Sequence, residues 1–154
     1  MRSRKNQRGF VLIAMSVTML LMLAVMGLAF DLGRVYIARN EAQIFTDAAA
    51  MTAAATLDGT SAGIDRAKKA AAQLPMRWNL GTKEFTGVVV EFKGDGESAK
   101  WESDPRDAAA VTMARVTVPS TSVEITFLRA VGGPNSFVVP ASSVAAINPV
   151  RLTQ

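Results

Sequence analysis

The side chains that most often carry out chemistry in enzymes are scarce in this sequence. Its 154 residues contain no Cys and no His, which excludes disulfides, thiolate nucleophiles, Cys/His zinc sites and histidine-based triads. There is no Walker A loop, no Rossmann glycine run and no G-x-S-x-G sequence. The acidic residues Asp95 and Glu97 lie among glycines, where such residues more often form a turn than bind a metal. The sequence therefore predicts a protein that is not an enzyme and that has no metal or cofactor site.

A cluster of basic residues at the N-terminus accounts for the net charge. The chain has 17 Lys and Arg against 13 Asp and Glu, a formal charge of +4. This excess is supplied by the basic cluster Arg2, Arg4, Lys5 and Arg8, and the residues after it are formally neutral. A basic chain raises the question of nucleic-acid binding. Because no basic patch follows the cluster, we expect no nucleic-acid partner.

An uncharged apolar segment, residues 10–30, follows the basic cluster directly. Its polar side chains are two hydroxyls, which can bond to preceding carbonyls in a helix. About 20 apolar residues in a helix cross the hydrocarbon core of a bilayer, which is roughly 30 Å thick. We therefore predict a transmembrane helix with Phe10 at one membrane boundary and with Phe30 and Asp31 at the other. The lipid bilayer is the first expected partner.

The basic cluster also indicates the orientation of this helix. Positive residues remain on the cytoplasmic side of a membrane, so residues 1–9 are expected in the cytoplasm and residues 31–154 outside it. The four residues of the basic cluster are then the topology-determining residues. A cleaved signal peptide is the alternative, but its apolar core is usually about 7 to 15 residues long, which is shorter than residues 10–30.

The helical pattern continues beyond the apolar segment, through residues 31–58. These residues contain no Pro and one Gly, and their apolar positions recur at helical spacing. We predict one helix from Phe10 to Asp58, on the order of 70 Å long, ended by Gly59. Its part beyond the membrane would be an amphipathic stalk. The apolar face of this stalk is expected to contain Ile37, Ala38, Ala42, Ile44, Phe45, Ala48, Ala49, Thr52 and Ala55, opposite Arg39, Asn40, Gln43, Thr46 and Asp47.

A second, shorter helix is expected after the stalk, at the start of a small domain formed by residues 60–154. Thr60 or Ser61 would cap it, and it would end at Leu74 because Pro75 prevents a clean continuation. Its inner face would carry Ile64, Ala67, Ala71 and Leu74.

Strand and turn patterns follow the second helix. Alternating apolar residues predict strands over residues 87–93, 111–118 and 136–147. Pro119 would end the second strand, and Pro140 makes the third an edge strand or a bulged one, since proline cannot donate to a ladder. The predicted fold class is therefore α+β, with pilin-like architecture: a transmembrane helix that continues into a long amphipathic helix and packs, with the second helix, on a small antiparallel sheet.

Residues 122–133 are open to two interpretations. They could form a fourth strand, or a short amphipathic helix closed by the two glycines at residues 132–133. In the helical case Phe127, Leu128 and Val131 form an apolar patch. Ordinary core packing is the first expectation for this patch, and contact with the bilayer surface or a partner is the alternative.

The N-terminal part of the chain also resembles a known family. The resemblance rests on Arg8-Gly9 before the apolar segment, on the string Gly27-Leu-Ala-Phe-Asp31-Leu-Gly-Arg34-Val-Tyr36, and on the run that begins at Asp47. Together these features resemble the N-terminal module of TadG/TadE-like proteins of tight-adherence (Flp) pilus systems. The positions that match the family's motif are Gly27, Asp31, Gly33, Arg34, Tyr36 and Asp47.

This resemblance implies a role in an adhesive pilus. The expected protein is a single-pass protein of the bacterial inner membrane, with its C-terminal domain in the periplasm, that assembles, anchors or terminates a Flp pilus. Its implied partners are other pilus-assembly or envelope proteins, or further copies of the same chain. Longer TadG-like proteins contain a von Willebrand A domain. This sequence has no D-x-S-x-S metal-binding motif and looks like a short form without that domain.

Two alternative functions remain open. The chain could be a minor pilin or pseudopilin, processed between Gly9 and Phe10 and incorporated in the filament. Prepilin-type sequences, however, have a glutamate at the fifth position after the cleavage site, where this chain has Ala14. The second alternative is a secreted small binding protein with a cleaved signal sequence. A retained membrane anchor is therefore the leading prediction.

Overall fold

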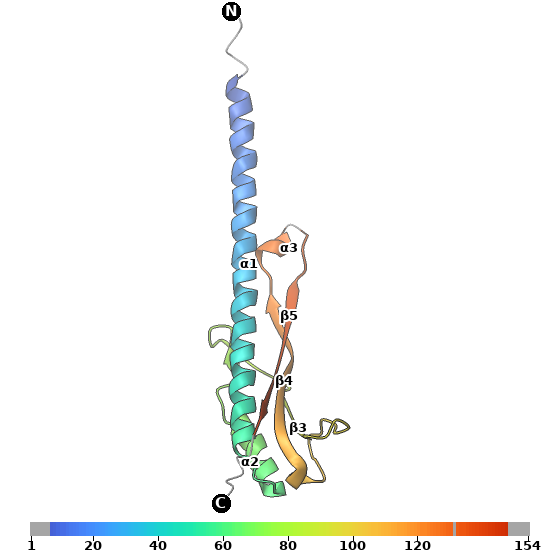
Figure 1. Ribbon diagram of the computed structural model, residues 1–154. Coiled ribbons are helices and arrows are strands. Elements are labelled where there is room, and N and C mark those ends of the chain that lie inside the picture. Colours follow the sequence, from blue (N-terminus) through green and yellow to red (C-terminus); the bar gives the residue numbers. More distant parts are fainter. Residues whose placement is uncertain (1–6, 131, 148–154) are drawn as a thin grey trace, which may run out of the picture. The chain divides into compact units, whose positions relative to one another are not determined.

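The computed structural model describes residues 7–130 and 132–147. The chain forms two compact units. The first unit comprises Met1–Tyr36 and Val123–Phe137, and the second comprises Ile37–Ser122 and Val138–Gln154. The long helix and two of the strands contribute residues to both units (Figure 1).

Helix α1 (Gln7–Ala55) is a single helix of 49 residues. Most of its residues are good helix formers such as Leu, Met and Ala, and it contains no Pro. The amides of residues 56–57 bond to carbonyls three residues back, so the chain tightens after Ala55. Gly59 has the left-handed conformation, with φ 78°, but it lies beyond the helix end. The predicted end at Asp58 was therefore wrong by about one turn.

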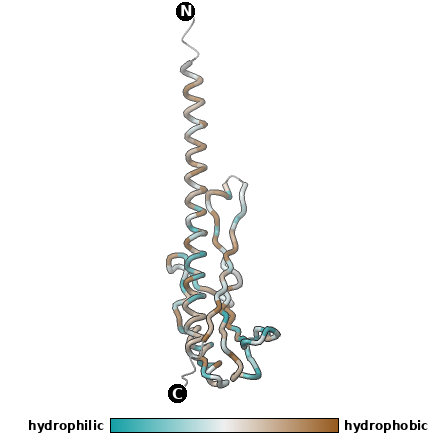
Figure 2. Tube along the Cα trace, in the orientation of Figure 1, coloured by the Kyte–Doolittle hydropathy of each residue, from teal (hydrophilic) through white to brown (hydrophobic). Residues whose placement is uncertain are grey.

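The two halves of α1 differ in character (Figure 2). Residues 10–26 are exposed around the helix, whereas from Gly27 onward buried or partly buried positions recur every three or four residues. This spacing places the buried side chains on one face. After Asp31, the buried residues of α1 are Ala38, Ala42, Phe45, Thr46, Ala49, Ala50, Ala53 and Ala54.

The position of this buried face differs in part from the prediction. Ile44 is 68% exposed and Ile37 is 41% exposed, although both were placed on the apolar face. Ala48 and Ala55 are exposed as well. Thr46, predicted to lie on the polar face, is fully buried. The hydroxyl of Thr46 donates to the Gln43 carbonyl at 3.0 Å and lies 2.8 Å from the Ser143 hydroxyl. A buried hydroxyl is tolerated when it is bonded.

Helix α2 (Ser61–Ala72) begins where the sequence predicted it. Thr60 is the N-cap, and its hydroxyl accepts a hydrogen bond from the Gly63 amide at 3.0 Å. The helix ends two residues before the predicted end at Leu74. Its buried face includes Ile64, Ala67 and Ala71, as predicted.

A three-stranded sheet contains β3 (Val89–Gly94), β4 (Val111–Glu124) and β5 (Ser136–Ala146), in that order. The pairing of β3 with β4 is antiparallel and places Phe92 opposite Ala114. Because β4 is central, β5 is an edge strand, as its internal proline predicted. The α+β fold class is confirmed.

Strand β4 does not end at Pro119, as the sequence predicted, but continues to Glu124. The pairing of β3 with β4 extends only to Thr117, and a proline is more easily accommodated beyond the paired region. The segment 122–133 was predicted to be either a fourth strand or a short helix, and it contains part of a strand and a short helix. It completes β4 and then forms the one-turn helix α3 (Phe127–Ala130).

A small hairpin in the second unit was not predicted. It consists of β1 (Arg77–Trp78) and β2 (Lys83–Glu84), paired antiparallel. The Trp78 ring stacks on Phe85 with centroids 5.9 Å apart, and Phe85 stacks on Phe45 of α1 at 5.0 Å. The Glu41 carboxylate accepts hydrogen bonds from the amides of residues 79–80, both of which have positive φ. Residues of α1 thus hold the hairpin at two points.

Candidate functional site

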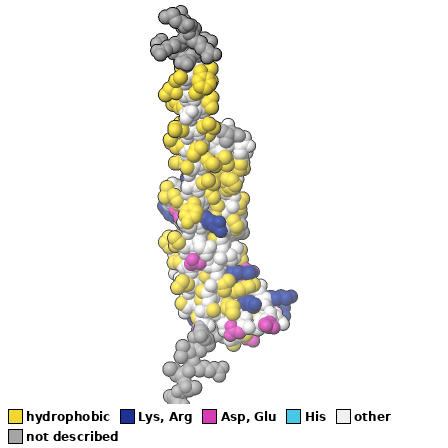
Figure 3. Space-filling model, turned by 45° about the horizontal axis from the view of Figure 1, so that its top comes forward, with side chains coloured by type: hydrophobic (Ala, Val, Ile, Leu, Met, Phe, Trp, Pro, Cys, Tyr) yellow, Lys and Arg dark blue, Asp and Glu magenta, His cyan; other side chains and the backbone are white. Residues whose placement is uncertain are grey.

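The surface of α1 over residues 10–26 is unusual, because it is both apolar and exposed. Phe10 is 74% exposed and Met15 is 71% exposed. Figure 3 shows hydrophobic side chains over the visible face of the helix next to the N-terminus, without a charged side chain among them. Soluble monomers rarely expose apolar patches larger than a few hundred Å². Helix α1 is long and apolar enough to cross a membrane.

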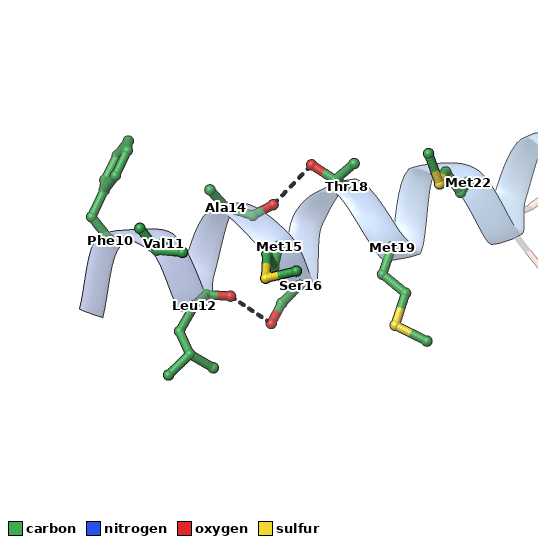
Figure 4. A pocket seen from close by; sticks show the side chains of 9 residues that line it. All are labelled: Phe10, Val11, Leu12, Ala14, Met15, Ser16, Thr18, Met19 and Met22. Atoms are coloured by element: carbon green, nitrogen blue, oxygen red, sulfur yellow. Dashed lines mark hydrogen bonds between the residues drawn. The ribbon is translucent and has the colours of Figure 1, made fainter. Parts of the chain in front are cut away.

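Two hydroxyls interrupt this apolar surface, and both bond within the helix. The Ser16 hydroxyl donates to the Leu12 carbonyl and the Thr18 hydroxyl to the Ala14 carbonyl, each at 2.9 Å (Figure 4). Phe10 and Leu12 project from opposite sides of the helix, so the apolar surface is not confined to one face. The segment can therefore enter hydrocarbon without leaving these hydroxyls unsatisfied.

At the end of the apolar surface, Asp31 binds the N-terminus of α3. Its side chain is buried, with 1% of the residue exposed. One carboxylate oxygen accepts from the Thr126 amide at 3.0 Å, and the other accepts from Phe127 and Leu128 at 2.8 and 2.7 Å. The first N–H groups of a helix have no partner within it. Asp31, although distant in sequence from α3, therefore acts as its N-cap.

The electrostatic state of Asp31 follows from these contacts. Burial raises the pKa of the carboxyl, whereas the three backbone N–H groups and the nearby charge of Arg34 lower it, and the net result is a pKa below the ordinary value. The group is therefore an anion at neutral pH, and it is bound by backbone dipoles.

Apolar contacts complete what we call the Asp31 junction: Gly27, Phe30, Asp31 and Arg34 of α1 with residues 124–128. The Phe127 and Phe30 rings pack edge to face, with centroids 5.5 Å apart and planes at 82°. A Cβ at position 27 would lie 2.6 Å from the Cβ of Phe127, so only glycine fits this approach. Arg34 donates to the Glu124 carbonyl at 3.3 Å.

In the second unit, Asp47 belongs to a polar cluster that we define as Gln43, Thr46 and Asp47 of α1 with Ser143 of β5. The Asp47 carboxylate accepts from the Gln43 amide at 2.9 Å and from the Ser143 hydroxyl. The Gln43 amide also donates to the Ser143 oxygen at 2.9 Å, and the Thr46 and Ser143 hydroxyls lie 2.8 Å apart. Such mutually satisfied groups hold two elements in one register.

The structure brings some of the family-motif residues together and not others. Gly27, Asp31 and Arg34 meet in the Asp31 junction, and Asp47 lies in the polar cluster. The other two motif residues are exposed on α1: Tyr36 is 66% exposed, and a Cβ at Gly33 would contact nothing within 4 Å.

The residues predicted to determine topology and processing lie at the start of the chain. Arg2, Arg4 and Lys5 are outside the described residues, and the backbone of Arg8 belongs to α1. Gly9 and Phe10, which flank the processing site of the pilin alternative, are exposed on the same helix.

Sequence reasoning missed the capping role of Asp31 and the polar cluster. Asp31 was interpreted only as a membrane boundary, and no local pattern connects it to Thr126, which is 95 positions away. Thr46 and Ser143 are 97 positions apart. One signal in the sequence pointed to the polar cluster: Ser143 occupies a position in the alternating pattern of its strand that belongs to the buried face.

Several acidic residues of the second unit have structural partners. Asp95 accepts from the Thr112 hydroxyl at 2.6 Å, and Asp104 pairs with Lys68. Within residues 7–130 and 132–147, no group of three or more His, Cys, Asp or Glu side chains is placed to hold a metal ion.

Comparison with known proteins relates these features to a family. Residues 9–56 match the family model described as "Putative Flp pilus-assembly TadE/G-like". The matched segment contains the exposed apolar surface and the α1 residues of both the Asp31 junction and the polar cluster. No curated protein and no solved structure matches the chain. The N-terminal segment is therefore TadE/G-like, and it contains a helix long and apolar enough to cross a membrane.

Proposed function

We propose that this chain is a non-enzymatic, single-pass membrane protein that acts in the assembly, anchoring or tip structure of a Flp-type pilus. The observation that carries the proposal is the exposure of residues 10–26 around α1, within the TadE/G-like segment. An uncharged helix of this kind leaves water only by entering lipid or by packing against other apolar helices. The predicted membrane segment, residues 10–30, supplies the length that a bilayer requires.

The proposed action is mechanical. Helix α1 continues beyond the predicted membrane boundary at Asp31 without a break, as far as Ala55. Its later residues are joined to β5 by the polar cluster and to β1 and β2 through Phe45 and Glu41. A load on the extracytoplasmic domain would pass to the membrane segment along one hydrogen-bonded helix, with other envelope proteins or further copies of the chain as partners.

We further propose that the protein lies in the bacterial inner membrane, with residues 1–9 in the cytoplasm and the C-terminal domain in the periplasm. The position of the basic cluster beside the apolar segment supports this orientation. The basic side chains after the cluster are balanced by acidic ones, so the charge difference across the segment comes from the cluster.

A topology assay tests this proposal. Alkaline phosphatase fused after Gln154 should be active, because it folds outside the cytoplasm. Replacing Arg2, Arg4, Lys5 and Arg8 by Gln should reduce this activity severalfold or invert the orientation. The control variant carries the same number of Lys→Gln changes far from the span, at Lys69, Lys83, Lys93 and Lys100. Unchanged orientation of the first variant would contradict the role given to the cluster.

The two other candidate functions use the same surface differently. In a minor pilin, residues 10–30 would pack against neighbouring helices of the filament, and the exposure of Gly9 and Phe10 is compatible with processing there. In a secreted binding protein the segment would be removed. The continuity of α1 from Gln7 to Ala55 favours a retained helix over a removable signal, because cleavage near residue 29 would also separate Gly27 from the contact it makes with Phe127.

A further inference from the structure

The connection between β4 and β5 carries an exposed aromatic side chain at an unusual place. Phe127 of α3 is 48% exposed, although its ring packs on Phe30 and its Cβ lies against Gly27. Both of these contacts belong to residues 10–30, the segment proposed to cross the bilayer. Figure 1 shows α3 beside α1.

The depth of Phe127 in a membrane follows from its contacts. Gly27 precedes the boundary residue Asp31 by four positions, which is a rise of roughly 6 Å along a helix. The headgroup layer on each side of the hydrocarbon core is about 5 to 7 Å thick. A side chain that touches Gly27 and Phe30 is therefore at the level where the acyl chains begin, not in the water beyond the headgroups.

Several backbone amides of this connection already have hydrogen-bond partners, and a segment that enters lipid requires such partners. Asp31 accepts from the amides of residues 126–128. The Ile125 amide donates to the Asn135 carbonyl at 2.9 Å. The amides of residues 132–133 donate to the carbonyls of Arg129 and Leu128 at 3.2 and 2.9 Å.

The charges at the connection suit a phospholipid surface. Arg129 is exposed at the end of α3, and Arg34 lies near Asp31 on α1. The Asp31 carboxylate, which would repel lipid phosphates, is covered by the α3 amides. Glu124 also lies here, and it is exposed on the strand side of α3. A cationic side chain beside an exposed aromatic one is the usual composition of a membrane interface.

We propose that α3 is a second membrane-contacting element and that the surface it binds is the lipid bilayer. Phe127 enters the acyl region of the leaflet at the C-terminal end of the span, and Arg129 lies at the level of the lipid phosphates. This inference rests on the proposed function, because the depth of Phe127 is defined by residues 10–30 crossing the bilayer. The first unit would then contact the membrane through two segments, which are α1 and the connection between β4 and β5.

Single cysteines allow a direct test, because the chain has none of its own. The full chain with Ala130→Cys is labelled with a polarity-sensitive fluorophore and reconstituted in vesicles of phosphatidylethanolamine and phosphatidylglycerol. The quenchers are lipids with a nitroxide at the headgroup, high on the acyl chain or near its end. Met22→Cys reports on the proposed span, and Ser98→Cys, an exposed residue of the second unit, is the aqueous control.

The expected result is that lipid nitroxides quench the label at residue 130 severalfold more than the label at residue 98. Quenching at residue 22 without quenching at residue 130 would overturn this inference and leave the proposed function in place. No quenching at residue 22 would overturn the proposed function and this inference with it. A disulfide dimer of the unlabelled Ala130→Cys variant, with no lipid quenching of the labelled variant, would also overturn the inference, since α3 would then contact a second copy of the chain.

Discussion

Asp31 joins two parts of the first unit that are far apart in sequence. Its carboxylate takes the three amide hydrogens at the start of α3, while the glycine one turn earlier on α1 allows Phe127 to approach the helix. The hydrogen bonds of Asp31 and the contact between Gly27 and Phe127 thus both stabilise the position of α3 on α1. At a membrane boundary this arrangement also lets a charged residue be buried, because the backbone donors replace the water it has lost.

The first prediction concerns the charge of Asp31. Asp31→Asn keeps the shape of the side chain but replaces one acceptor oxygen with a donor group, which cannot accept the amide bonds made by that oxygen. We expect the amides of residues 126–128 to exchange with solvent at least severalfold faster, as measured by hydrogen-exchange mass spectrometry. Asp65→Asn, at an exposed position of α2, is the control. If the amides of residues 126–128 were equally protected in both variants, Asp31 would not be the cap of α3.

The second prediction concerns pH. Because the pKa of Asp31 is lower in the folded protein than the value of about 3.9 in an unfolded chain, its contribution to stability is present above that value and is lost as the pH falls through the folded pKa. Protection of residues 126–128, corrected for intrinsic exchange, should therefore be constant from about pH 5 to 7 and decrease below about pH 4. The same decrease in Asp31→Asn would show that another group is responsible.

The third prediction compares two glycines on α1. Alanine in place of glycine inside a helix normally stabilises it by about 0.5 to 1 kcal/mol. Gly33→Ala should show this gain, since its new Cβ would contact nothing within 4 Å. Gly27→Ala should instead displace Phe127, because the new Cβ would lie 2.6 Å from the Cβ of that residue. Limited proteolysis of detergent-solubilised protein should cleave residues 124–133 faster in Gly27→Ala only, and equal rates would contradict the contact.

At the scale of elements, the buried face of α1 is built mainly from alanine. Ala42, Ala49 and Ala53 are fully buried, and small side chains allow the backbone of a neighbouring element to come close. Bonded side chains set the register in this packing: the polar cluster joins α1 to β5, and Glu41 holds the turn between β1 and β2. Helix α1 is therefore both a candidate membrane element and a wall of the core of the second unit.

The fourth prediction tests this close packing with one pair of neighbours. Ala49→Leu adds volume at a fully buried position, and overpacking of this kind usually costs about 1 to 3 kcal/mol. Ala48→Leu makes the same change at an exposed position, where the effect should stay within about 0.5 kcal/mol. Denaturant unfolding of the detergent-solubilised protein measures both. Similar stabilities of the two variants would mean that the alanine face is not packed.

Local signals in the sequence were sufficient for some elements and not for others. Thr60 predicted the start of α2 because an N-cap acts within three residues, and Pro140 predicted an edge strand because its effect on the ladder is local. Pro119 misled because it is tolerated beyond the region where β3 pairs with β4. The Asp31 junction and the polar cluster could not be predicted, since each depends on partners more than 90 positions away.

At the scale of the whole molecule, one helix contributes to both units and to the proposed membrane anchor. The TadE/G-like match, residues 9–56, covers nearly the whole of this helix. The strands that complete the two units lie outside the match. The TadE/G-like segment therefore takes part in the Asp31 junction, in the polar cluster and in the proposed membrane anchor.

The most direct test of the central claim, a retained anchor formed by residues 10–30, is the intact mass of the protein. Membranes are washed with alkaline carbonate, the protein is extracted in detergent, and its mass is measured. We expect a membrane-bound species that keeps residues 1–9, with the 16.4 kDa of the 154 residues. Loss of residues 1–9 alone would favour the minor pilin. A soluble species that has lost about residues 1–29, as signal-peptide cleavage would leave, would contradict the account.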